Sequence, residues 1–177
     1  MHPRLAVVLS LLALVLSGAA LALGLRPAEA GAAEVSGAPG EPAGELAHHM
    51  AYAQRFAEKL YFAGMADHAA LASFYVHELE ETFEAVAAGG YVEDGRDVGE
   101  ATRALFLPHL AGVEAALEAG APNDDAEEAR GLFEARYRAL VLGCNACHEA
   151  TGHGFVRITV PEASSFPNQT FARPGTE

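Results

Sequence analysis

The sequence predicts an all-α protein: an antiparallel up-down-up-down four-helix bundle over residues 45–150, followed by an irregular C-terminal tail over residues 151–177. Three observations lead to this fold class. Apolar residues recur at the three- and four-residue spacing of a helix face. Alternation with a period of two, which marks a half-buried strand, is absent before residue 155. Clusters of Gly, Pro, Asn and Asp form short connections between the helical stretches, and short connections suit antiparallel neighbours.

The first two helices are predicted at residues 45–63 and 67–88. Gly64 is expected to end the first helix. Asp67 is suited to cap the second helix, because its carboxylate can accept hydrogen bonds from the free backbone N–H groups of the first turn. A pair of glycines ends the second helix. The first helix carries an apolar stripe, which comprises Leu46, Met50, Ala53, Ala57 and Leu60.

A polar loop is predicted at residues 91–99, before a third helix at residues 100–119. Pro108 lies inside this third helix and is expected to kink it, because proline has no backbone N–H to donate. Asn123 or Asp124 is expected to cap the fourth helix. The acidic first turn of that helix is favourable to the helix dipole.

Residues 1–30 have the composition of a signal peptide. Arg4 supplies a positive start, an apolar run follows, and two small-x-small sites near the end of this segment could be cleaved. If the segment is not cleaved, the stretch at residues 5–25 is long enough to anchor the chain in a membrane. Both alternatives predict a domain in the periplasm or otherwise outside the cytoplasm. Residues 31–44, rich in Ala, Gly, Pro and Glu, are predicted to form a flexible linker.

Near the C-terminus, Cys144-Asn145-Ala146-Cys147-His148 forms a C-x-x-C-H motif, the signature of a covalently attached c-type haem. Two thiols one helical turn apart can reach the two vinyl groups on one edge of the porphyrin. His148 can then supply an axial nitrogen to the iron. A thioredoxin-like disulfide would accompany a βαβ pattern, and a structural zinc site would need a second Cys/His pair. The sequence has neither, so we predict one haem c with His148 as the proximal ligand.

The second axial ligand is predicted from the topology of the bundle. In an antiparallel arrangement, the end of the fourth helix lies beside the start of the first, which places Met50 and His148 at nearly the same height across the core. Met50 is therefore the leading candidate. The alternatives are a Met50 that only packs in the core, or ligation by His48 or His49. At most one of these three neighbouring side chains is expected to point inward.

The four helices, with the haem motif on the last of them, resemble cytochrome c′ and its b-type bundle relatives over residues 45–150. In cytochrome c′ the histidine is the only protein ligand, whereas in the b-type relative a methionine near the start of helix one pairs with a histidine on helix four. The arrangement of Met50 and His148 is similar to the second case. The resemblance also implies a homodimer formed through the first helix. The chain departs from cytochrome c′ in having 29 residues after His148.

Further residues are predicted to contact the haem. Phe83 is placed to pack near the haem edge. The tail at residues 151–177 contains too many apolar side chains for a solvated segment and is predicted to fold back over the haem end. His153 or Arg157 could then bond a haem propionate, since arginine is suited to a bidentate carboxylate contact. The alternative is that both are merely surface residues.

The sequence favours an electron carrier rather than an enzyme. Ligation by histidine and methionine raises the reduction potential of a haem. One alternative, implied by the resemblance to cytochrome c′, is a five-coordinate haem that binds NO or CO. Another is an accessory subunit that relays electrons inside a larger complex. The formal net charge of −13 argues against a nucleic-acid partner and favours a redox partner protein with a basic docking surface.

Overall fold

The computed structural model describes residues 42–120 and 125–175. The predicted signal peptide and the predicted linker up to residue 41 lie outside these residues. None of the helices in the described ranges is both long enough and apolar enough to cross a membrane. The anchor predicted at residues 5–25 falls outside the described part of the chain.

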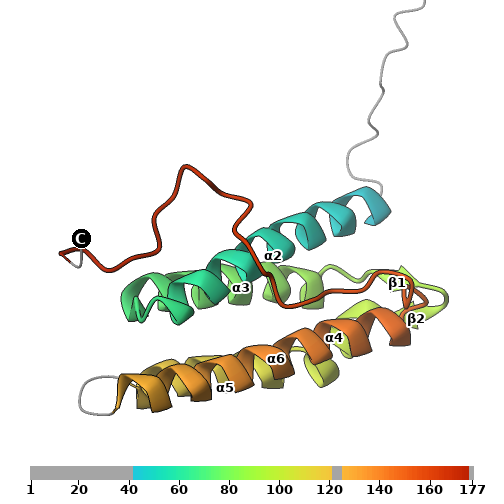
Figure 1. Ribbon diagram of the computed structural model, residues 1–177. Coiled ribbons are helices and arrows are strands. Elements are labelled where there is room, and N and C mark those ends of the chain that lie inside the picture. Colours follow the sequence, from blue (N-terminus) through green and yellow to red (C-terminus); the bar gives the residue numbers. More distant parts are fainter. Residues whose placement is uncertain (1–41, 121–124, 176–177) are drawn as a thin grey trace, which may run out of the picture. The chain divides into compact units, whose positions relative to one another are not determined.

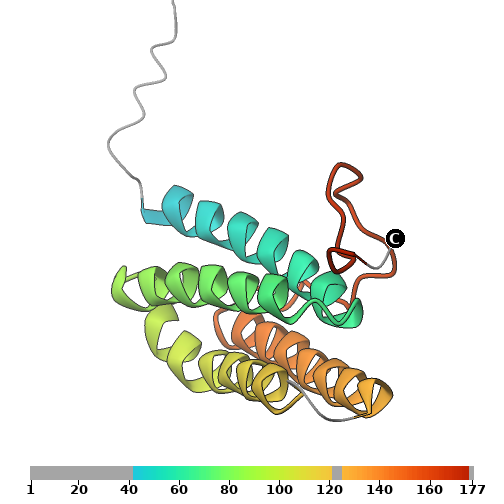
Figure 2. The same ribbon diagram turned by 90° about the vertical axis from the view of Figure 1, so that its left-hand side faces the viewer.

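The described part of the chain is all-α, as predicted, apart from one very short hairpin. Its helices are α2 (Pro42–Met65), α3 (Ala69–Ala88), α4 (Val98–Leu105), α5 (Leu107–Ala119) and α6 (Ala126–Ala150). Helices α2 and α3 lie side by side as one pair, and α5 and α6 as another (Figures 1 and 2). The two pairs share one core, because α3 contacts α4 and α5, and α2 contacts α6.

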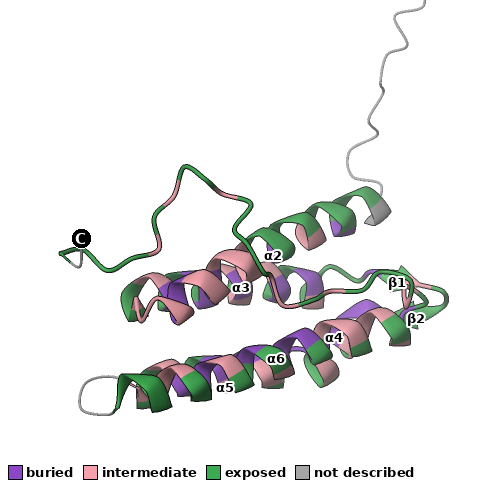
Figure 3. Cartoon of the chain, viewed as in Figure 1, coloured by how far each residue is buried: buried purple, intermediate pink, exposed green. Residues whose placement is uncertain are grey.

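The core lies where the helices face one another (Figure 3). Of the stripe predicted on the first helix, Leu46, Ala53 and Leu60 are buried, whereas Met50 and Ala57 are half-buried. Each large apolar side chain removed from water stabilises the fold by about 1.5–3 kcal/mol. The largest apolar side chains that are completely buried are Leu60, Leu79, Val86, Phe106, Leu110, Val113, Tyr137 and Leu140.

The predicted third helix is divided into α4 and α5. Phe106 lies between them with φ −111° and ψ −55°. Pro108 accounts for the break, because it cannot donate to the carbonyl of Ala104 and its ring excludes that carbonyl from the next helical turn. The side chain of Phe106 is buried in the core.

The predicted polar loop at residues 91–99 contains a hairpin, which the sequence prediction missed. Strand β1 (Val92–Glu93) pairs antiparallel with β2 (Arg96–Asp97). The turn residues Asp94 and Gly95 have φ of 50° and 74°, the left-handed values that a tight hairpin turn requires. The hairpin leads directly into α4, since the Asp97 carboxylate accepts a hydrogen bond of 2.8 Å from the Glu100 N–H. An Asp-Gly pair is a known hairpin signal, so this turn was visible in the sequence.

Two predicted helix caps require correction. Asp67 does not cap the second helix, because the N-cap position is His68, which makes no capping hydrogen bond with its side chain. The Asp67 carboxylate lies instead 3.7 Å from the Arg130 guanidinium. The fourth helix is capped by Asp125, whose carboxylate accepts from the Glu127 N–H at 3.0 Å. The predicted caps at 123 and 124 lie outside the described residues.

Gly64 does not end the first helix, which continues to Met65. Its role is in packing: the ring of Phe133 from α6 lies directly on Gly64, and a methyl group at this position would overlap the ring. Glycine therefore allows α2 and α6 to approach closely. The sequence pattern suggested a helix terminator because glycine serves both purposes.

Replacing Gly64 with alanine should lower the free energy of unfolding by about 1–3 kcal/mol, because the buried Phe133 ring must shift. Gly131→Ala is the matched control, since Gly131 is exposed on α6 with nothing within 4 Å of an added Cβ. The control should stabilise the protein by about 0.5–1 kcal/mol. Urea unfolding followed by circular dichroism measures both changes. Equal stabilities of the two variants would contradict this packing.

The tail leaves α6 beside the hairpin and then runs along α2 (Figure 1). The Ser165 N–H donates to the Glu58 carboxylate, and the ring of Phe166 lies 4.5 Å from the Lys59 ammonium. Further along, Phe171 packs 5.6 Å from Phe62, measured between ring centroids. The described tail, residues 151–175, contains no helix or strand.

Candidate functional site

The two cysteines lie in the last turns of α6, and both are free thiols. Cys144, Cys147 and His148 all line one cavity of about 440 Å³. This volume is within the range of about 300–1,000 Å³ that is typical of ligand and cofactor sites. The motif is therefore directed into a cavity of cofactor size.

Residues from helices far apart in the sequence form the walls of this cavity. Met50 lines it from α2, and Phe83 lines it from α3. Phe83 stacks on Phe106 with 3.7 Å between ring centroids, which gives the cavity an aromatic wall. Most of the other lining side chains are apolar as well, among them Leu46, Ala53, Leu79, Val98 and Ile158.

His148 is oriented by the tail. Its Nδ1 lies 3.0 Å from the carbonyl oxygen of Val156, which can only accept a hydrogen bond. Nδ1 therefore carries the proton, and the lone pair of the neutral imidazole is on Nε2. Histidines that bind metals usually donate one ring N–H to a carbonyl or carboxylate, which leaves the other nitrogen free to bind the metal.

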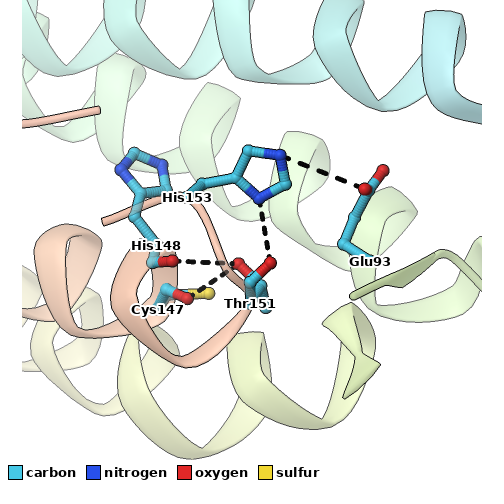
Figure 4. Close-up of polar contacts among 5 residues, drawn as sticks. All are labelled: Glu93, Cys147, His148, Thr151 and His153. Atoms are coloured by element: carbon cyan, nitrogen blue, oxygen red, sulfur yellow. Dashed lines mark hydrogen bonds and ion pairs between the residues drawn. The ribbon is translucent and has the colours of Figure 1, made fainter. Parts of the chain in front are cut away.

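Polar contacts connect the end of α6 with the hairpin (Figure 4). The Thr151 hydroxyl donates to the Cys147 carbonyl at 2.9 Å, and His153 Nδ1 lies 3.0 Å from the Thr151 carbonyl. Nε2 of His153 lies 4.0 Å from the Glu93 carboxylate in β1. These contacts hold His153 on the cavity wall.

The electrostatics of the two thiols disfavour thiolate chemistry. Burial, supported by the nearby Cys147, raises the pKa of the Cys144 thiol to about 12. Burial also raises the pKa of Cys147. Thiol–disulfide exchange and metal coordination both require the thiolate. Within the described ranges, no group of three or more His, Cys, Asp or Glu side chains is arranged to hold a metal ion.

The predicted site residues differ in where they lie. Met50, Phe83 and His153 line the cavity together with the motif, whereas Arg157 is exposed and does not line it. Among the alternatives to Met50, His48 is exposed and His49 is half-buried, with its ring centroid 6.2 Å from that of Tyr91. Neither histidine lines the cavity.

Two polar residues at the site were missed in the sequence. Asn145, inside the motif, pairs with the backbone of Ile158 in the tail. Thr102 on α4 lines the cavity, and its buried side chain interacts with the Cys147 thiol, which opposes the effect of burial on the pKa of that thiol. The sequence does not single out either residue. The haem motif specifies only its two cysteines and its histidine, and a threonine inside a helix does not by itself indicate a site.

No family model, curated protein or solved structure matches the chain. Function is therefore inferred from the chemistry of the cavity. The donor set fits a c-type haem: two thiols one turn apart, an imidazole with its Nε2 lone pair available, and a thioether that lines the same apolar cavity. Cys144 and Cys147 would hold the group covalently, and His148 and Met50 would bind its iron.

Proposed function

We propose that the chain is an exported monohaem c-type cytochrome that carries electrons. The proposal rests mainly on one observation. Met50 on α2 lines the same cavity as Cys144, Cys147 and His148 on α6, although these are the first and the last described helices in the sequence. Such a haem, when bound, supplies a one-electron change between ferric and ferrous iron. A histidine and methionine pair raises the reduction potential.

The protein's own residues prepare the site for this role. The Val156 carbonyl fixes the orientation of the His148 ring, so that little reorganisation accompanies electron transfer. Apolar side chains on α2 and α3, with the tail residues Val156 and Ile158, make the lining of the cavity mostly apolar. A low-polarity environment is one of the means by which a protein sets the potential of a haem.

The proposal includes an antiparallel up-down-up-down four-helix bundle, with α4 and α5 together acting as its third helix. The pairing of α2 with α3 and of α5 with α6 supports this arrangement. The short connection of α2 to α3 supports it as well.

The location and partners of the protein follow from the haem proposal. Cytochromes with this motif receive their haem outside the cytoplasm, which agrees with the signal peptide or anchor in the sequence. The net charge of −13 supports a redox partner with a basic docking surface. The resemblance to cytochrome c′ supports a homodimer through α2.

The proposal is tested on the full chain, exported from a host that attaches c-type haem. The haem should remain bound after denaturation, and a Cys144→Ala/Cys147→Ala variant should lose it. The reduced protein should show a low-spin spectrum that does not change on adding CO, because Met50 occupies the sixth position. A wild-type chain that carries no covalent haem would overturn the proposal.

The second candidate is a five-coordinate haem protein that binds NO or CO. The apolar lining of the cavity favours it, because Leu46, Ala53 and Phe83 would supply a water-excluding distal face if Met50 did not bind the iron. In this case the wild-type spectrum is high-spin and shifts on adding CO. The same measurement therefore decides between the two functions.

A further inference from the structure

The side chain of Asn145 forms a two-bond clamp on the tail. Its Nδ2 donates to the Ile158 carbonyl at 2.9 Å, and its Oδ1 accepts from the Ile158 N–H at 2.8 Å. This is the pattern by which two strands pair, with a side-chain amide in place of one strand. Both groups are partly buried, so the clamp is shielded from competition by water.

Two residues before Ile158, the Val156 carbonyl accepts the hydrogen bond from His148 Nδ1. The backbone between the motif and Val156 is fixed by two further hydrogen bonds. The His153 N–H donates to the His148 carbonyl at 2.7 Å, and the Val156 N–H donates to the His153 carbonyl at 2.8 Å. The tail is thus held on both sides of the carbonyl that faces His148.

We infer that Asn145 is a positioning residue for the haem: by clamping Ile158, it keeps the Val156 carbonyl on His148 Nδ1 and so sets the basicity and orientation of the axial nitrogen. The inference rests on the proposed haem attachment and assigns a role to a motif position that the attachment chemistry leaves undefined. A hydrogen bond from Nδ1–H makes the opposite nitrogen a stronger donor to iron. A stronger donor favours the ferric state and lowers the reduction potential.

The sign of the expected shift separates this role from a merely structural one. Loss of the clamp weakens the Nδ1 hydrogen bond, which should raise the midpoint potential. Loosening the tail without this effect would only admit water, and water stabilises the more highly charged ferric state, which lowers the potential. An upward shift therefore reports on the His148 hydrogen bond.

The experiment uses the exported, haem-bearing full chain and redox titration of its absorption spectrum. Asn145→Ala should raise the midpoint potential and speed hydrogen exchange of the Ile158 amide. Asn145→Gln, which keeps the amide on a longer stem, should give a potential between those of the wild type and Asn145→Ala. The matched control is Asn168→Ala, an exposed tail position, which should change neither quantity.

Two results would overturn the inference while leaving the haem proposal standing. In the first, the midpoint potential of Asn145→Ala equals that of Asn168→Ala, even though the Ile158 amide exchanges faster. In the second, the midpoint potential of Asn145→Ala is lower than that of the wild type. If Asn145→Ala does not mature, an Asn145→Gln potential that is not raised above the wild type overturns it in the same way. A wild-type chain without covalent haem is a distinct failure, since it removes the proposed function itself.

Discussion

Replacing Met50 with alanine should convert a haem iron that is indifferent to CO into one that binds it. Met50 is half-buried in α2 and lines the cavity with His148, and no other methionine of the described residues lines it. Alanine is too short to reach the iron, so the sixth coordination position becomes available to small ligands. The reduced spectrum should change from low-spin to high-spin and shift when CO is added. The midpoint potential should fall with the loss of the thioether.

Met65→Ala is the matched control for this change. Met65 is also a half-buried methionine of α2 that packs on the core, but it does not line the cavity. Truncating a fully buried methionine to alanine lowers the free energy of unfolding by about 2–5 kcal/mol, and the loss should be smaller at this half-buried position. The absorption spectrum should stay unchanged. An unaltered spectrum in Met50→Ala would show that Met50 is not a ligand.

Replacing Gly143 with alanine should destabilise the protein by about 1–3 kcal/mol and also reduce haem incorporation. A Cβ at this position would lie 2.6 Å from the Leu105 carbonyl oxygen and 2.7 Å from His109 Cδ2. The oxygen belongs to the backbone at the break between α4 and α5, so it cannot rotate away as a side chain could. Helix α6 must therefore move, and it carries Cys144 in the next position.

The control for Gly143 is Gly112→Ala in α5, where the nearest atom to an added Cβ is Arg136 Cδ at 3.8 Å. This is ordinary contact, so the variant should keep its haem and should be stabilised by about 0.5–1 kcal/mol, as expected for alanine in place of glycine inside a helix. Thermal unfolding and the ratio of haem absorbance to protein absorbance measure the two effects. A Gly143→Ala protein with wild-type haem content would show that the close contact with Leu105 does not position the motif.

Local rules predicted most of the helical fold, although the Asp94-Gly95 turn signal of the hairpin was overlooked. Helical periodicity predicted the all-α class, and the lack of an N–H in Pro108 predicted the disturbance near Phe106. The errors came where one residue type serves two purposes. Gly64 has the local pattern of a helix end, but it makes room for Phe133 from a helix far along the chain. Such a contact depends on tertiary packing and leaves no local pattern.

For the candidate site, the sequence predicted the residues with distinctive chemistry. The two cysteines and His148 have the spacing that covalent haem attachment needs. Met50 was chosen because an antiparallel bundle would place it at the same height as His148. Asn145 could not be predicted, because its partner Ile158 is set by the path of an irregular tail. Arg157, which was one of two candidates for a propionate contact, is exposed and does not line the cavity, and that contact stays a prediction.

The tail also has a kinetic consequence. Its residues Ser165 and Gln169 bond to Glu58 and Tyr75, which lie 107 and 94 positions earlier in the chain. Contacts over such separations form slowly compared with helices, so the tail should dock last during folding. The part of the tail that lines the cavity behaves differently, because Val156 and Ile158 bond to His148 and Asn145, which lie only 8 and 13 positions earlier in the chain. This wall of the cavity can therefore form as soon as the end of α6 has folded, and the slow docking of the last residues leaves it unchanged.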